Sequence, residues 1–326
     1  MATYLVTGAA GFIASKVCEQ LLAAKHTVIG VDSLNEYYDV HLKHWRLGQL
    51  QAGRGFVFYP LDIENLVALD KVFAAHKFAA VFNLAARAGV RASLKHPELY
   101  ERTNVTGEKN ILECQVKHGV KKHVLASSSS LYAGCPMPFT EDQPVDHPQS
   151  PYAETKRKAE LLARSYHEQH GLDVSVLRYF TVFGPAGRPD MAPFRFIKWI
   201  DEGHSISLFG DGSQARDFTY VDDIARGTIL AAKPLGYEII NLGGGRNPMT
   251  LRAVIALMEK ELGKQARISV KKASAADMKE TWADITKAKR LLGWEPEITA
   301  EEGFRRTVEW HVANREFVHQ IKVTSG

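Results

Sequence analysis

Val6-Thr7-Gly8-Ala9-Ala10-Gly11-Phe12-Ile13-Ala14 is the stretch of this chain that decides its fold. A short apolar run at 4–7 leads into it and an amphipathic pattern over 11–24 follows, so the glycines join a strand to a helix. Gly8 permits a tight turn, and Gly11 lets backbone N–H groups approach a pyrophosphate at the helix N-terminus. A glycine pattern alone is equally compatible with an ordinary turn. In this context it predicts a dinucleotide-binding loop, with Gly8, Gly11, Phe12 and Ile13 as cofactor contacts.

Strand-like and helical patterns alternate through the first 180 residues. Apolar runs typical of strands lie at 27–32, 57–59, 80–84, 123–127 and 174–179, and helical patterns lie at 67–76, 106–118 and 152–170. Such alternation is typical of βαβ units, so we expect an α/β fold with a Rossmann-type doubly wound parallel sheet. Ligands bind at the carboxyl ends of the strands in sheets of this kind.

The pattern changes after about residue 180. Turn-rich stretches appear at 184–189 and 210–212, and amphipathic segments follow at 251–262 and 301–312. We therefore predict a dinucleotide-binding Rossmann domain at 1–180. A smaller α/β substrate-binding domain is expected at 181–326, with segments that interleave with the first domain.

The composition argues against several classes of function. The chain is 45% hydrophobic and 24% charged with a net charge of +4, and its Lys and Arg residues form no concentrated stripe, so we expect no nucleic-acid partner. Its three cysteines form no CxxC pair and no His–Cys cluster, which predicts a reducing compartment and no metal site. There is no signal-like N-terminus and no run of about 18 apolar residues. We therefore expect a cytoplasmic protein without a membrane span.

Asp32 indicates which dinucleotide binds. It ends the second strand-like run, where a carboxylate can accept hydrogen bonds from both ribose hydroxyls and would repel a 2′-phosphate. The next residues, Ser33-Leu34-Asn35, supply no Arg for such a phosphate, so the sequence predicts NAD rather than NADP. An Asp that only caps a turn is the alternative. Asp62 and Ile63, after the third strand, are candidates for the edge of the adenine pocket, with plain loop structure equally open.

Tyr152 and Lys156 are the candidate catalytic pair. They are four residues apart behind Pro151, which suits the first turn of a helix, so both side chains can face one ligand. A nearby ammonium and a cationic nicotinamide would lower the pKa of Tyr152 and let its phenolate remove a hydroxyl proton. Lys156 can also bind the nicotinamide ribose. The spacing alone also fits an exposed helix pair.

A serine cluster, Ala126-Ser127-Ser128-Ser129-Ser130-Leu131-Tyr132, follows the apolar run at 123–125. A hydroxyl at that strand end can orient a reacting sugar oxygen and relay its proton. A solvated turn is the alternative for the serines taken alone. The loop, the acid, the serines and the Tyr/Lys pair together favour an enzyme.

With these motifs the chain resembles the extended short-chain dehydrogenase/reductases over essentially its whole length. Within them it is most similar to the UDP-glucuronate 4-epimerases, and the segments that carry the similarity lie at 32–40, 83–91, 178–192, 216–223 and 283–288. The resemblance implies NAD held through the catalytic cycle and a UDP-sugar bound by the domain at 181–326. It also implies a homodimer formed through the helices at 91–118 and 152–170, although the apolar faces of these helices can equally be core.

The resemblance also implies individual roles. Ser128 would supply the catalytic hydroxyl, with Ser127 and Ser129 flanking the sugar. The other substrate contacts would be Thr181, where galactose epimerases carry Asn, Arg188 near the sugar carboxylate, Arg216 on the diphosphate and Asp277 in the uridine-side pocket.

Three features depart from the family pattern and bear on the identity of the sugar. Arg87 stands where Gln is expected, Ala133 follows Tyr132 where Gly is usual, and the loop at 135–138 is short. Related dehydratases and decarboxylases need an extra acidic residue. In this sequence serines, Ser129 and Ser130, occupy the positions where those enzymes carry it.

Without that acid, the reaction left for this chain is reversible oxidation and re-reduction of the sugar. We expect 4-epimerisation of UDP-glucuronate to UDP-galacturonate through a 4-keto intermediate. A 4-epimerase of UDP-glucose or UDP-N-acetylglucosamine is the alternative within the family. A non-catalytic NAD-sensing or scaffold protein is the alternative from another class, and the intact Tyr152 and Lys156 argue against it.

Overall fold

The alternating pattern of the first half builds a parallel sheet. A computed structural model describes residues 1–245, 248–272 and 278–323 of the chain. Within these residues the large sheet has seven strands in the order β11-β6-β5-β4-β1-β2-β3, and every neighbouring pair is parallel. The strands are β1 Thr3–Thr7, β2 Thr27–Asp32, β3 Phe56–Pro60, β4 Ala80–Asn83, β5 Lys122–Ser128, β6 Asp173–Tyr179 and β11 Tyr237–Leu242.

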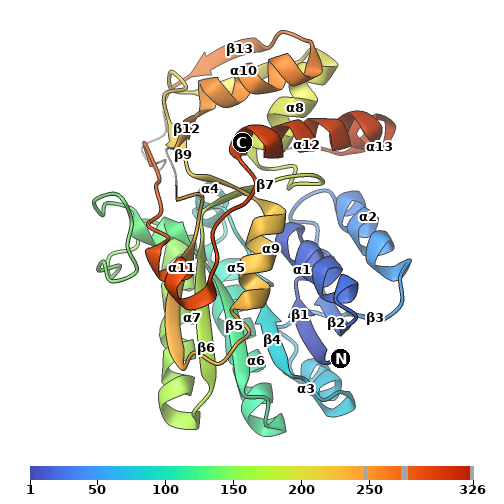
Figure 1. Cartoon of the computed structure of the whole chain (residues 1–326), viewed down its shortest axis with the longest axis vertical. Coiled ribbons are helices and arrows are strands. Elements are labelled where there is room, and N and C mark those ends of the chain that lie inside the picture. The colour runs from blue at the N-terminus through green and yellow to red at the C-terminus, as the bar shows by residue number, and fades with distance from the viewer. Residues whose placement is uncertain (246–247, 273–277, 324–326) are drawn as a thin grey trace.

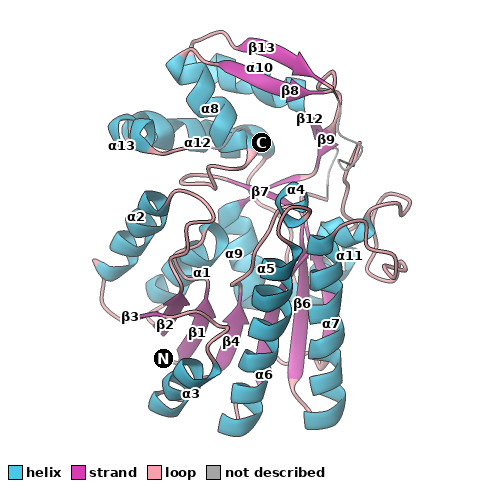
Figure 2. Cartoon of the chain, turned by 180° about the vertical axis from the view of Figure 1, so that it is seen from behind, coloured by secondary structure: helices cyan, strands magenta, loops and turns pink. Residues whose placement is uncertain are grey.

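Helices cover both faces of this sheet. On the face seen in Figure 1, α1 (Phe12–Ala23) packs against α9 (Val221–Leu230), and α11 (Thr286–Leu292) lies against β11. On the face seen in Figure 2 lie α3 (Leu66–Ala75), α6 (Gly107–His118) and α7 (Pro151–His170). The doubly wound α/β fold expected from the sequence is confirmed.

The direction of winding reverses between β1 and β4. From β1 the chain proceeds through β2 to β3 on one side, and β4, β5 and β6 extend the sheet on the other. The loops that leave neighbouring carboxyl ends therefore diverge at this point and open a crevice, which is where ligands bind in sheets of this kind.

A second body of structure lies beyond the carboxyl ends of the strands (Figure 1). Its strands pair two by two, β7 (Thr181–Phe183) with β10 (Phe218–Tyr220), β8 (Ser205–Phe209) with β13 (Arg267–Lys271), and β9 (Ala215–Arg216) with β12 (Met249–Thr250). Its helices are α8 (Ala192–Glu202), α10 (Leu251–Leu262), α12 (Ala300–Ala313) and α13 (Arg315–Gln320). The domain boundary at residue 180 stays a prediction, and α9 and β11, which follow it, pack with the large sheet.

Several elements were not expected from the sequence. Besides the strand pairs they include α2 (Val40–Gln51). The helical range expected at 91–118 is divided into α4 (Val90–Ser93), α5 (Pro97–Glu101) and α6. In α2 the buried face carries Lys43 and Arg46 as well as Leu42 and Leu47, so charged residues interrupt the apolar period on which a helix prediction depends. No helix of the described ranges is long and apolar enough to span a membrane.

One buried carboxylate joins the helices of the second body. The side chain of Asp201, near the end of α8, is 1% exposed and accepts hydrogen bonds from Lys264 Nζ at 2.7 Å, Arg315 Nε at 2.8 Å and His311 Nε2 at 3.2 Å. Burial alone would raise the pKa of Asp201, but these hydrogen bonds outweigh it and hold the pKa well below its usual range. Asp201 thereby ties α8 to α12, to α13 and to the segment after α10.

We expect Asp201→Asn to destabilise the fold by about 3 kcal/mol, because it removes the buried negative charge that Lys264, Arg315 and His311 share. Since the folded pKa is depressed, this contribution is complete above the unfolded pKa of about 3.9 and is lost as the pH falls through the folded value. Urea unfolding at pH 7 and at pH 3 measures it. Asp70→Asn is the control, because Asp70 bonds Lys117 and His118 at an exposed site and should matter much less. Equal losses in the two variants would contradict this account.

Candidate active site

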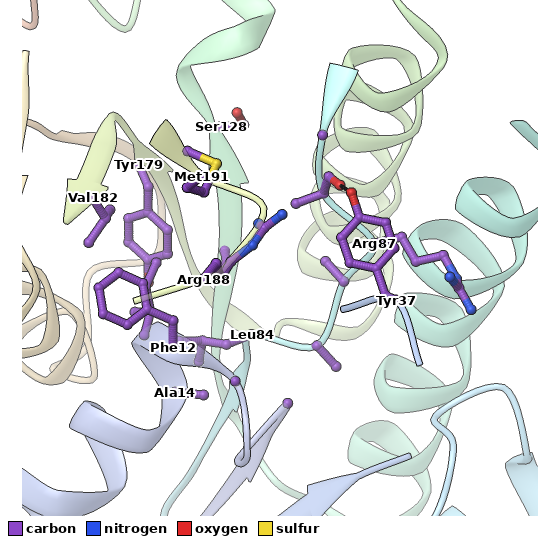
Figure 3. Close-up of a pocket in the computed structure, with 18 of the residues that line it drawn as sticks. Phe12, Ala14, Tyr37, Leu84, Arg87, Ser128, Tyr179, Val182, Arg188 and Met191 are labelled. Carbon is purple, nitrogen blue, oxygen red and sulfur yellow. Dashed lines mark hydrogen bonds between the residues drawn. The ribbon is translucent and has the colours of Figure 1, made fainter. Parts of the chain in front are cut away.

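The crevice at the winding reversal is a cavity of about 500 Å³. The carboxyl ends of β1, β2, β4 and β5 line one side of it, and β7 with the loop that follows lines the other. All the site residues predicted from the sequence line this cavity, except Asp277, which lies outside the described residues. Figure 3 shows part of the wall, with Phe12 and Ser128 from two distant segments and Tyr179 and Arg188 from a third.

The glycine loop packs directly on the end of β4. Gly8 has a φ of +68°, and a Cβ there would lie 3.0 Å from the backbone of Ala85. Thr7 fixes this approach, because its Oγ1 accepts from the Ala85 N–H at 3.1 Å and donates to Asn83 Oδ1 at 2.5 Å. Gly11 closes the turn by donating its N–H to Gly8 O at 2.7 Å and is the N-cap of α1. Having no side chain, it cannot satisfy the first N–H groups of α1, which suits an anion there.

Asp32 lies at the carboxyl end of β2 and is 7% exposed. Its Oδ2 accepts from the Ala10 N–H at 3.1 Å and its Oδ1 from the Leu34 N–H at 2.8 Å. A carboxylate has about four acceptor positions, so capacity for ribose hydroxyls remains. Asp62 and Ile63 line the same end of the cavity, and Asp62 also accepts from the Glu64 N–H at 3.0 Å.

Lys43 is a cavity residue that the sequence analysis missed. It projects from α2, and its Nζ lies 3.8 Å from Asp32 Oδ1. Burial lowers the pKa of Lys43, and Asp32 opposes that shift. Asp39, which caps α2 by accepting the His41 N–H, is the sequence signal that could have located this helix and with it Lys43.

Tyr152 lies in the first turn of α7, as the Pro151 signal predicts. Ser150 caps that helix by accepting the Ala153 N–H at 3.2 Å. Burial raises the pKa of Tyr152, while a hydrogen bond with Ser128 and the charge of Arg188 oppose the rise. The opposing effect was expected from Lys156, but its ammonium donates to the Ala126 carbonyl at 2.8 Å. Tyr152 and the serine loop therefore meet at the carboxyl end of β5.

Lys156 is 4% exposed, and burial lowers its pKa to about 8. The carboxylates of Glu108 and Glu160 oppose this shift. Because this pKa lies close to neutral pH, a ligand that binds beside Lys156 can change its protonation state.

The serines do not all face the cavity in the same way. Ser127 donates its hydroxyl to Glu160 Oε1 at 2.6 Å, and Glu160 in turn pairs with Arg178 at 2.7 Å. The Ser127 hydroxyl therefore anchors β5 to α7, although the family resemblance implied a sugar contact. Ser128 caps a short 3₁₀ turn by accepting the Ser130 N–H at 3.2 Å, and its hydroxyl remains beside Tyr152.

The opposite wall supplies Thr181, Arg188 and Arg216. Arg188 pairs bidentately with Asp190, at 3.0 Å from Nε to Oδ1 and 2.5 Å from Nη2 to Oδ2, and its guanidinium lies 5.6 Å from the centre of the Tyr37 ring (Figure 3). Three of its five donors remain after these two bonds. Arg216, on β9, donates to the Ala215 carbonyl at 2.8 Å.

Comparison with known proteins identifies relatives over the whole chain. The family model described as the NAD dependent epimerase/dehydratase family matches residues 4–243. A UDP-glucuronate 4-epimerase of Thermodesulfobacterium geofontis (strain OPF15) is 58% identical, over 99% of this chain and 100% of the relative.

Two solved structures are similar throughout. The UDP-glucuronic acid 4-epimerase of Bacillus cereus, in complex with UDP-glucuronic acid and NAD, aligns with a TM-score of 0.89 and 36% identity, over 95% of this chain and 99% of the other. The UDP-glucose 4-epimerase of Thermotoga maritima, with UDP-glucose, aligns with a TM-score of 0.87 and 33% identity, over 96% and 99%.

We expect Gly8→Ala to weaken NAD binding by about tenfold or more, because the new Cβ would push the turn away from Ala85 and displace the N–H groups aimed at the pyrophosphate. Calorimetric titration with NAD measures it. Gly119→Ala is the matched control, since Gly119 has a φ of +71° with nothing within 4 Å of a new Cβ. If both variants bind NAD alike, the close approach of Gly8 is not what the site requires.

Proposed function

Because this chain belongs to the NAD dependent epimerase/dehydratase family, we propose that it is an NAD-dependent 4-epimerase that interconverts UDP-glucuronate and UDP-galacturonate. The observation that carries the proposal is one cavity in which Tyr152 and Ser128 meet opposite Arg188, with Asp32 and the glycine loop at the cofactor end.

The cavity fits NAD. The turn at Gly8 and Gly11 presents an uncapped helix N-terminus for a pyrophosphate, and Asp32 retains acceptors for ribose hydroxyls. The buried Asp32 carboxylate disfavours the added phosphate of NADP. NAD held by the turn at Gly8 and Gly11 and by Asp32 would supply a reversible hydride acceptor for C4 of the sugar.

Tyr152 acts as the general base. Its phenolate removes the proton of the 4-hydroxyl as the C4–H electron pair leaves as hydride, and the phenol gives a proton back when hydride returns to the other face. Ser128 orients the 4-oxygen, because its hydroxyl reaches the same phenol. Lys156 holds the end of β5 through Ala126 and keeps a buried positive charge in the cavity.

An acidic sugar brings a hazard that Arg188 and Thr181 are placed to control. The 4-ketone stands beside the carboxylate on C5, and such a β-keto acid loses CO2 when the C5–carboxyl bond aligns with the carbonyl π system. A guanidinium can hold the carboxylate out of alignment through two hydrogen bonds, and a hydroxyl can fix its remaining oxygen. Asp190 orients Arg188 through the other edge of the guanidinium.

A 4-epimerase of UDP-glucose or UDP-N-acetylglucosamine is the second candidate. The similar structure from Thermotoga maritima, which holds UDP-glucose, supports it. Arg188, whose side chain is 20% exposed where it lines the cavity, favours the acidic sugar, since a neutral hydroxymethyl group would leave its remaining donors without a charged partner.

We further infer a cytoplasmic homodimer. Val116 on α6 and Leu161 on α7 are 37% and 47% exposed on neighbouring helices of one face, which suits a self-complementary apolar contact. The cytoplasmic setting rests on three cysteines that are all free thiols.

We expect Tyr152→Phe to lose at least about 100-fold in turnover of UDP-glucuronate, because it removes the proton acceptor, while NAD binding is retained. Chromatographic separation of UDP-glucuronate and UDP-galacturonate over time measures turnover. Tyr166→Phe on the same helix is the control and should stay near wild type. Near-normal turnover by Tyr152→Phe would remove Tyr152 as the base.

We expect Arg188→Ala to weaken binding of UDP-glucuronate more than binding of UDP-glucose, because only the former offers a carboxylate. Thr181→Ala should raise the share of decarboxylated UDP-pentose among the products. A time course that resolves UDP-galacturonate from UDP-pentoses tests both variants. If Arg188→Ala changes neither affinity, rate nor product ratio, the neutral-sugar epimerase becomes the better assignment.

A further inference from the structure

Arg46 is a buried cation that the mechanism above does not use. It lies on α2, is 3% exposed and stands behind the cavity wall. Its donors go to backbone carbonyls of two loops that are far apart in the sequence. Nη1 donates to Ala10 O at 3.0 Å, and Nε and Nη2 donate to Ala186 O at 3.1 and 2.7 Å. Nη2 also reaches Gly187 O at 3.2 Å.

Ala10 belongs to the cofactor loop. Its N–H donates to Asp32 Oδ2 at 3.1 Å, and its carbonyl accepts from Arg46. The backbone of Ala10 therefore links Asp32, the expected ribose ligand, to the guanidinium of Arg46. Tyr38 supports the same edge, because its hydroxyl accepts from Arg46 Nη1 at 2.8 Å.

Ala186 and Gly187 belong to the loop that carries Arg188. Ala186 has a φ of +50°, a conformation that residues with a Cβ rarely adopt, and it is only 5% exposed. A strained residue persists where its surroundings determine it. Here two guanidinium donors converge on the Ala186 carbonyl, and the planar fork of an arginine is suited to that.

We propose that Arg46 is a positioning residue that couples the cofactor loop to the sugar-carboxylate loop. By holding Ala186 in its left-handed conformation, Arg46 sets the direction in which Arg188 enters the cavity. Through Ala10 the same guanidinium fixes that loop relative to Asp32. The substrate part of this inference rests on the proposed function.

The test compares Arg46→Met and Arg46→Lys with a matched control, Lys198→Met. Lys198 is also a buried cation, 5% exposed, that donates to backbone carbonyls, Val318 O at 2.8 Å and His319 O at 3.0 Å, away from the cavity. All variants are compared with NAD bound, at temperatures matched to their melting points. Arg46→Lys keeps the charge without the fork and serves if Arg46→Met does not fold.

The first readout is hydrogen exchange of the backbone amides of residues 186–188 and 190. We expect exchange there to be about tenfold faster in the Arg46 variants, because the loop loses its support, and unchanged in Lys198→Met. The second readout is kinetic. The Arg46 variants should raise KM for UDP-glucuronate and the share of UDP-pentose about tenfold, with a smaller change in kcat. Adding Ala186→Gly to Arg46→Met should recover part of both, since glycine adopts a positive φ without steric cost.

The outcomes separate this inference from the proposed function. If the Arg46 variants and Lys198→Met agree in loop exchange and in product ratio, Arg46 has only a structural role and the inference is overturned. If Ala186→Gly gives no recovery, Arg46 does not act through Ala186. If loop exchange changes as expected but the wild-type enzyme does not convert UDP-glucuronate, the positioning role stands and the proposed sugar is wrong.

Discussion

The contact between the turn at Gly8 and the end of β4 is the constraint on which the site depends. A side chain at Gly8 would lie 3.0 Å from the Ala85 backbone, and Thr7 bridges the same two segments through Asn83 and the Ala85 N–H. This contact lies where the winding of the sheet reverses, so it sets how far the two halves diverge. Because β5 follows β4 in the sheet, the position of the serine loop relative to the cofactor loop is fixed by the same contact.

The elements that carry Tyr152 and Ser128 are joined by a second, fully buried interaction. Glu160 of α7 pairs with Arg178 of β6 and accepts from Ser127 of β5, and Arg178 also donates to the Tyr132 hydroxyl at 2.9 Å. Burying such an ion pair is costly, so it adds little net stability compared with apolar packing. Its effect is geometric, because α7 carries Tyr152 and β5 carries Ser128. The Tyr152 phenol and the Ser128 hydroxyl, which we propose act on one substrate atom, therefore lie on elements that cannot shift independently.

What the sequence could predict was determined by local pattern. The glycine loop, Asp32 and the Tyr152–Lys156 pair are each defined by spacing within one strand–turn–helix unit, and the structure brings these residues to one cavity. Lys43 and Arg46 were missed because they are charged residues on the buried face of α2, where a periodicity argument expects apolar ones. The direction of the Ser127 hydroxyl was not predictable either, since its partner Glu160 is 33 residues away in the chain. Residue spacing therefore indicates which side chains meet a ligand when one structural element carries them all. It does not indicate which hydrogen-bond partners a side chain finds in segments that are distant in the sequence.

The helix that carries Arg46 is completed from the far end of the chain. The Lys322 N–H donates to Asp39 Oδ2, at the N-cap of α2, across a separation of 283 residues, and Trp45 of α2 packs on Trp310 and Phe317 of α12 and α13. During synthesis on the ribosome, α2 emerges on the order of tens of seconds before these partners exist. During that interval the side of α2 that carries Trp45 is not yet covered by Trp310 and Phe317. The contacts that complete α2, beside the cofactor loop, can therefore form only after residues 310–322 have been synthesised.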